Sequence, residues 1–123
     1  MAVEIICSQT VSGLSEGMVI FFSAMGLTLI FGSLKVLNIS HGSMYMIGAY
    51  FMVAGNAMFS AFPAHFHLAL VCATLGTGII GGILEIVLIR PIYKLHHLFQ
   101  FIVTFSATFV FMDLVKMIWG GAH

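Results

Sequence analysis

Asn38, Ser40 and His41 are polar side chains that stand between two apolar segments of the chain. The first segment closes at Lys35, and the second restarts at His41-Gly42. If the chain turns sharply here, the carbonyl groups that end one helix and the N–H groups that begin the next converge. Broken helices of this kind are where transporters place polar contacts to their solutes. The alternative is an interhelical turn in which Asn38 caps a helix and Gly42 relieves strain. The residues alone leave both interpretations open.

Histidines are the other candidates for chemistry. His65-x-His67 and His96-His97 each place two imidazoles close together, but neither pair has a third ligand at a recognisable spacing. The chain contains no GxSxG, no HExxH and no phosphate-binding loop with its lysine, and it has no basic patch suited to nucleic acid. We therefore expect no metal, no cofactor, no nucleic-acid partner and no enzymatic activity.

The composition identifies the bilayer as the solvent. Hydrophobic residues make up 61% of the 123 residues and charged residues only 7%, which leaves too little polar surface for a water-soluble particle. A spanning helix needs ~20 mostly apolar residues. Four windows meet this need, approximately 12–34, 41–62, 67–89 and 98–119. The sequence thus predicts an all-α fold, a polytopic transmembrane helix bundle of about four spans in a single region, 1–123.

The few cations predict the orientation of these spans. Lys35 closes the first window, and Arg90 with Lys94 lies between the third and the fourth. Lys and Arg are retained on the cytoplasmic side, and alternating helices would put both places on one side. We therefore expect that side to be cytoplasmic and the amino terminus to lie outside, although Lys116 near the end of the last window points the other way. A re-entrant segment at 38–48 would invert everything after it.

Small residues in the third window predict helix contacts. Gly78 and Gly82 form a GxxxG pair, and Gly81 belongs to a neighbouring stripe of small residues at four-residue spacing. Because glycine lets another backbone come close, we expect these three positions to pack against a helix.

Glu85 is the only acid in the third window, and it lies close to Arg90 in the sequence. One interpretation is an interfacial carboxylate that pairs with Lys94 or Lys35, with Glu85 and Arg90 as interface charges. The other is an intramembrane acid on a substrate or proton path. The position near the inner end of the span favours the first interpretation.

The stretch from Gly26 to Tyr50, GLTLIFGSLKVLNISHGSMYMIGAY, resembles the amino-terminal signature of branched-chain amino acid ABC transporter permeases of the LivH type. In that family a phrase like GLTLIFG, an Asn-x-x-His-Gly step and a Gly-Ala-Tyr element follow one another. Further landmarks occur in the same order, so that the resemblance covers nearly the whole chain: Leu84-Glu85, Arg90-Pro91, Ile102-x-Thr104 and Trp119-Gly120. The chain departs from the family at Ser40, where alanine is usual, and permeases for urea and short amides resemble the same signature.

The resemblance implies a membrane-spanning permease subunit of an ATP-binding-cassette importer in the bacterial cytoplasmic (inner) membrane. Its partners would be a second permease subunit, two cytoplasmic ATP-binding subunits that hydrolyse ATP, and a periplasmic binding protein that delivers leucine, isoleucine or valine. Four residues would shape the translocation path or its helix break: Asn38, His41, Gly42 and Tyr50.

Two alternatives remain beside this interpretation. One is a permease for urea or short amides, and the other is a small four-helix accessory membrane protein or channel. Family permeases are also considerably longer than 123 residues, so the resemblance predicts an amino-terminal fragment of a permease.

Overall fold

The fold is all-α, as predicted. The structure, a computed structural model, describes residues 1–120, and within them it contains no strand. Its elements in chain order are helix α1 (Ala2–Leu34), helix α2 (His41–Met58), helix α3 (His65–Leu84), the π-helical η1 (Glu85–Ile89), the 3-10 turn η2 (Arg90–Ile92) and helix α4 (His97–Trp119).

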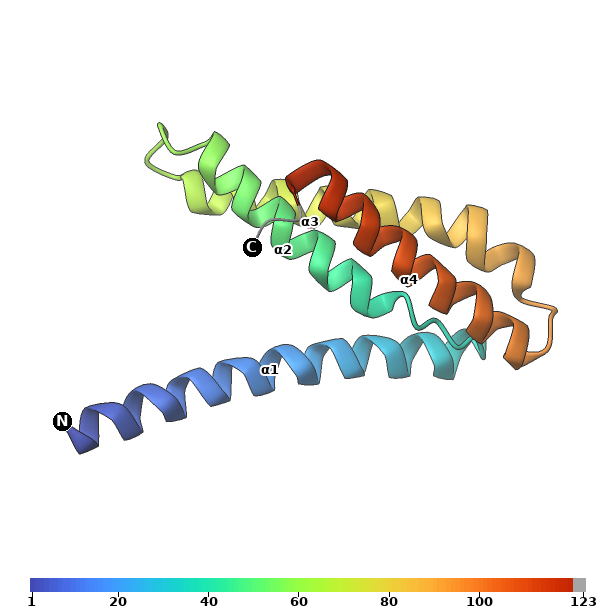
Figure 1. The fold of residues 1–123 in the computed structure, drawn as a ribbon, viewed down its shortest axis with the longest axis horizontal. Helices are drawn as coiled ribbons and strands as arrows, with labels where there is room; N and C mark the ends of the chain where they lie inside the picture. Colours follow the sequence, from blue (N-terminus) through green and yellow to red (C-terminus); the bar gives the residue numbers. More distant parts are fainter. Residues whose placement is uncertain (121–123) are drawn as a thin grey trace.

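Helices α2, α3 and α4 form a bundle, and α1 diverges from it toward the amino terminus (Figure 1). α2 is the central helix, because it packs extensively on α3 and also contacts α4 and α1. Successive helices run in opposite directions, so the α1–α2 connection and the α3–α4 connection lie at the same end of the molecule (Figure 1). Lys35, Arg90 and Lys94 therefore share one end. α2 is one continuous helix from His41 to Met58.

Three of the helices within residues 1–120 are long and apolar enough to cross a membrane: α1, α3 continued through Ile92, and α4. The protein is therefore a multi-pass membrane protein. α1 contains the whole predicted window 12–34 but begins at Ala2, and its 33 residues span about 50 Å, more than the ~30 Å of a hydrocarbon core. α2 has 18 residues and is not among the three. Because α2 contacts every other helix, less of its surface has to be apolar.

Small residues bring α2 and α3 together. A Cβ added at Gly55 of α2 would lie 3.3 Å from both Cα and Cβ of Ala69 on α3, and one added at Gly48 would lie 3.3 Å from Oγ1 of Thr77. Ala69 and Ala73 are both buried in this interface. The two helices therefore pack through backbone and short side chains, the pattern expected where lipid provides no hydrophobic driving force.

Gly55→Val is expected to lower the free energy of unfolding by about 1–3 kcal/mol, because the valine side chain would overlap the backbone of α3. Thermal unfolding of the purified protein in detergent measures this effect. Gly13→Val is the control, since a Cβ at Gly13 meets nothing within 4 Å. Equal melting temperatures for the two variants would contradict the close approach of α2 and α3 at Gly55.

The predicted packing glycines differ in their surroundings. A Cβ at Gly81 would lie 4.0 Å from Sδ of Met44, whereas a Cβ at Gly78 or Gly82 would meet nothing within 4 Å. Gly78 and Gly82 thus have no neighbouring helix against them within residues 1–120, and their role in packing stays a prediction.

The regular α-helical hydrogen bonding of α3 ends at Leu84, because Pro91 follows in the same stretch of chain. Proline has no N–H to donate, and its ring conflicts with the carbonyl group four residues earlier, here that of Val87. The chain responds with the wider turn of η1 and the tighter turn of η2. The predicted window 67–89 ends inside this irregular stretch, which carries Glu85 and Arg90.

Candidate site at the break between α1 and α2

Lys35 ends α1 in a left-handed backbone conformation, with φ of 56°, and its N–H donates to the carbonyl of Phe31 at 2.9 Å. Among residues 1–120 it is the only residue other than glycine with positive φ. A left-handed residue ends a helix abruptly, because the chain leaves the helix axis at once. The break predicted after Lys35 therefore begins with a sharp change of direction.

The segment that follows, residues 36–40, is packed inside the protein. Val36, Asn38 and Ser40 are buried, and the alternate residues Leu37 and Ile39 are partly exposed. Val36 belongs to a cluster of buried apolar side chains at the end of α3. Non-helical backbone is tolerated at membrane depth only where protein or water satisfies its polar groups, so this segment needs partners from another helix.

α4 supplies those partners through Gln100 and Thr104, which are 1% and 0% exposed. Oε1 of Gln100 accepts the N–H of Leu37 at 3.4 Å, and Oγ1 of Thr104 accepts the N–H of Ile39 at 3.3 Å. Nε2 of Gln100 faces the α3–α4 connection, where three carbonyl groups lie 3.1–3.4 Å away, those of Ile92, Tyr93 and Leu95. One amide side chain thereby ties both connections at this end of the molecule to α4.

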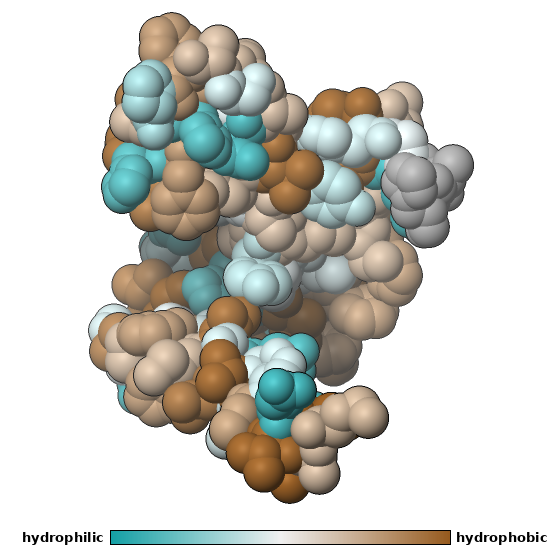
Figure 2. Space-filling view, turned by 90° about the vertical axis from the view of Figure 1, so that its left-hand side faces the viewer, coloured by the Kyte–Doolittle hydropathy of each residue, from teal (hydrophilic) through white to brown (hydrophobic). Residues whose placement is uncertain are grey.

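A cavity of about 480 Å³ lies beside this break, between α1, α2 and α3. Its wall is mostly apolar, with Ser23 of α1, His41 of α2 and Thr77 of α3 among its polar side chains. Seen from the end where α1 begins, the surface is largely apolar and is hollowed between its upper and lower parts (Figure 2). Oγ1 of Thr77 is buried and has no hydrogen-bond partner within the described residues. This hydroxyl faces Gly48 of α2, where a Cβ would lie 3.3 Å away, and within residues 1–120 it is unpaired beside the cavity.

His41 lies against α1 because Gly26 has no side chain. A Cβ at Gly26 would be 2.8 Å from Nε2 of His41, a separation that forces the imidazole to move. The glycine of the GLTLIFG phrase and the histidine of the His-Gly step thus meet across the α1–α2 boundary.

The structure brings only one of the four predicted path residues into the cavity, which is His41. Oδ1 of Asn38 accepts the hydroxyl of Ser40 at 2.5 Å, and Ser40 rather than Asn38 occupies the position that caps α2. Gly42 is exposed, has no positive φ, and a Cβ there would meet nothing within 4 Å. The ring of Tyr50 lies 5.5 Å from that of Trp119 on α4, away from the cavity lining.

Glu85 has a different partner from the cations expected for it. Its carboxylate accepts a hydrogen bond from the hydroxyl of Tyr93, the residue that directly follows η2. Within residues 1–120 no ion pair joins Glu85 to Lys94 or Lys35, and Arg90 is exposed. The carboxylate thus helps to fold the α3–α4 connection onto the end of α3.

Sequence reasoning missed Gln100. The available signal was that it is the one amide side chain in the window 98–119, four residues before Thr104, so that both lie on one face of the helix. His96, considered as a metal ligand, instead accepts the N–H of Leu98 through Nδ1 at the start of α4. In the part of the chain that the structure describes, no three His, Cys, Asp or Glu side chains gather in a way that could hold a metal ion.

Comparison with known proteins gives a family for this chain. No curated protein and no solved structure matched it. Residues 9–122, however, match the family described as "Branched-chain amino acid transport system / permease component". The match includes the break, the cavity residues and all of α2, α3 and α4. The chain therefore belongs to the family of branched-chain amino acid transport permeases.

Proposed function

We propose that this chain is a permease subunit of an ATP-binding-cassette importer that passes leucine, isoleucine and valine across the bacterial cytoplasmic membrane. A periplasmic binding protein delivers the amino acid, a second permease subunit completes the path, and two cytoplasmic ATP-binding subunits drive the cycle. Family membership supports the permease role. The end that carries Lys35, Arg90 and Lys94 faces the cytoplasm, because Lys and Arg are enriched there.

The observation that carries the proposal is the cavity between α1, α2 and α3. Small-molecule sites are concave and mostly apolar, with a few polar groups that fix the orientation of the ligand. Leucine and its relatives have a branched apolar side chain and two charged groups, which matches an apolar wall that also presents His41, Ser23 and Thr77. α1 diverges from the bundle on this side (Figure 1), so the cavity lies between this helix and the packed pair α2 and α3.

Uptake of radiolabelled leucine tests the proposal. A strain that lacks this gene but keeps the rest of the locus is compared with the same strain carrying the gene on a plasmid. We expect uptake only with the gene, competition by unlabelled isoleucine and valine, and loss of uptake when ATP is depleted. Uptake that does not depend on the gene would contradict the proposal, and competition by urea or acetamide alone would assign a different solute.

His41→Ala is expected to lower leucine uptake about tenfold at equal protein level, the factor that corresponds to the loss of one ~1.4 kcal/mol interaction. Asn38→Ala removes the acceptor of the Ser40 hydroxyl and is expected to cost about 1 kcal/mol of stability, with a smaller effect on uptake. Uptake normalised to immunoblot intensity, together with melting temperature, separates the two effects.

His67→Ala is the control for the loss of an imidazole, since His67 is exposed and does not line the cavity. A larger loss of uptake for Asn38→Ala than for His41→Ala would move the proposed path from the cavity to the segment 36–40.

A further inference from the structure

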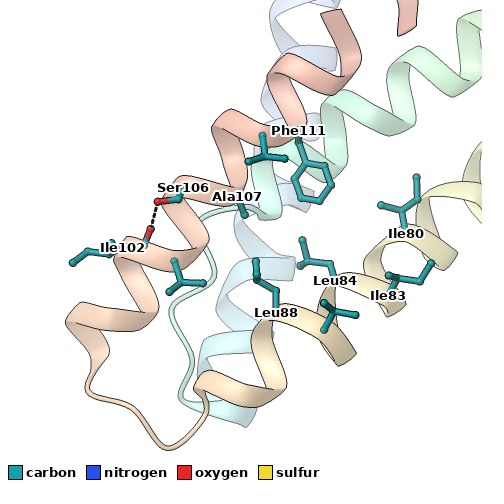
Figure 3. Close-up of a pocket in the computed structure, with 11 residues that line it drawn as sticks. Ile80, Ile83, Leu84, Leu88, Ile102, Ser106, Ala107 and Phe111 are labelled. Carbon is teal, nitrogen blue, oxygen red and sulfur yellow. Dashed lines mark hydrogen bonds between the residues drawn. The ribbon is translucent and has the colours of Figure 1, made fainter. Parts of the chain in front are cut away.

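A second hollow, on a different side of the bundle, is an apolar groove of about 570 Å³ between α4 and the end of α3 with η1. Figure 3 shows side chains from both walls pointing into it. Leu84 and Leu88 belong to one wall and Ala107 and Phe111 to the other, and Ile80 and Ile102 also line the groove. The single hydroxyl in the lining belongs to Ser106, which already donates to the carbonyl of Ile102 at 2.8 Å. The groove therefore has no side chain free to bind a polar solute.

Positive charge lies just beyond one end of this groove. Val87 lines the groove, and Arg90 follows three residues later, about one helical turn further on. Lys94 comes next, in the connection to α4, and both cations are exposed. Neither forms an ion pair within residues 1–120, and the acid closest to them in sequence, Glu85, accepts the hydroxyl of Tyr93. An anion at this end of the groove would meet two uncompensated cations.

We propose that this groove binds an anionic phospholipid, with one acyl chain in the groove and the phosphate group on Arg90 and Lys94. The apolar lining takes the chain, and the cations lie where the chain would reach its headgroup. Basic sites between transmembrane helices bind lipid headgroups in this way, and each Lys or Arg near the surface contributes to the attraction. The groove is lined by residues of α3, η1 and α4 and shares none with the proposed path cavity, so the inference does not depend on the solute.

The shape of the groove favours a lipid chain over a transmembrane helix of a partner. Helices approach closely where small residues face one another, whereas branched side chains form these walls, among them Ile83, Val87 and Val110. A flexible acyl chain can follow such a surface. The small-residue surface at Gly78 and Gly82 lies outside the groove lining.

Photolabelling of the protein in its native membrane tests the proposal. The probe is phosphatidylglycerol with a diazirine on one acyl chain, and phosphatidylethanolamine with the same labelled chain is the comparison. We expect phosphatidylglycerol to label peptides containing residues 80–88 and 102–111 in preference to other helical surfaces. Equal labelling by both lipids around all helices would show ordinary bilayer lipid and overturn the proposal, as would a cross-link from another protein chain in the groove.

Variants of the cations give a second measurement, the retention of phosphatidylglycerol on the purified protein in mild detergent. Arg90→Gln and Lys94→Gln are each expected to weaken binding about fivefold, from ~1 kcal/mol per cation. Lys116→Gln is the matched control, because Lys116 lies in the last turn of α4, at the opposite end of that helix from the α3–α4 connection, and its Nζ is 3.8 Å from Oδ1 of Asp113. Ala107→Phe fills the groove but leaves Arg90 and Lys94 unchanged. It is expected to remove the photolabel from residues 80–88. Equal effects of Lys94→Gln and Lys116→Gln would overturn the assignment of the headgroup site.

Discussion

Gln100→Met is expected to lower the free energy of unfolding by about 3–5 kcal/mol, because several buried polar groups lose their partner together. Methionine keeps the length of the side chain but neither donates nor accepts as an amide does. The N–H of Leu37 would lose its acceptor, and three carbonyl groups of residues 92–95 would lose their donor. Gln100 is 1% exposed, so bulk water cannot replace these bonds in the folded state.

Three further variants separate the parts of this network. Gln100→Glu keeps an acceptor for Leu37 but removes both amide protons, so it should lose the bonds to the α3–α4 connection. Thr104→Val removes the hydroxyl that accepts the N–H of Ile39, at an expected cost of about 1–3 kcal/mol. Ser106→Ala is the control, since that exposed hydroxyl bonds only to a carbonyl of its own helix.

Thermal unfolding in detergent measures the loss of stability, and limited proteolysis measures the opening of the two connections. Gln100→Met is expected to expose cleavage sites in residues 35–40 and 92–96 while α1 and α2 stay resistant. A melting temperature equal to that of Ser106→Ala would show that the two connections do not depend on α4.

The helices could be predicted from the sequence because a membrane segment must be apolar throughout its length, a local property of the chain. The predicted first window ends at residue 34, where α1 ends at Leu34, and the predicted second window begins at His41, where α2 begins. Lys35 and His41 interrupt the apolar run, and both lie at helix ends. The irregular end of α3 was not foreseen, because the effect of Pro91 on the preceding turn depends on backbone geometry.

The contents of the site depend on contacts between distant residues, and these have no local signature. Gln100 and Leu37 are 63 residues apart in the chain and meet only because α4 packs against the break. The hydrogen-bond partners of hydroxyl side chains could not be predicted either. Thr74 donates to a carbonyl of its own helix, whereas Thr77 is buried without a partner in the described residues. Nothing in the sequence distinguishes these two threonines, because the difference arises from their neighbours.

Gly78→Leu is expected to reduce leucine uptake to near background, while Gly82→Leu leaves uptake close to that of the unchanged protein. Gly78 lines the cavity between α1, α2 and α3, and Gly82 does not. A Cβ at either position meets nothing within 4 Å, so the first carbon of either leucine side chain has room. Both changes also replace glycine with a better helix former, which favours α3 by about 0.8–1 kcal/mol. Under the proposed function, only the leucine at 78 would occupy the cavity that receives the solute.

This pair of variants also separates the two roles open to these glycines. If Gly78 and Gly82 form a GxxxG contact with a helix of a partner subunit, leucine at either position would hold that helix away, and uptake would fall equally. Native gel electrophoresis of the assembled complex would then show loss of the partner subunit for both variants. An intact complex with uptake lost only for Gly78→Leu would instead place the solute in the cavity beside His41. If both variants keep the complex intact and uptake unchanged, both roles are contradicted. Each role predicts that Gly78→Leu lowers uptake, either by filling the cavity or by displacing the partner helix.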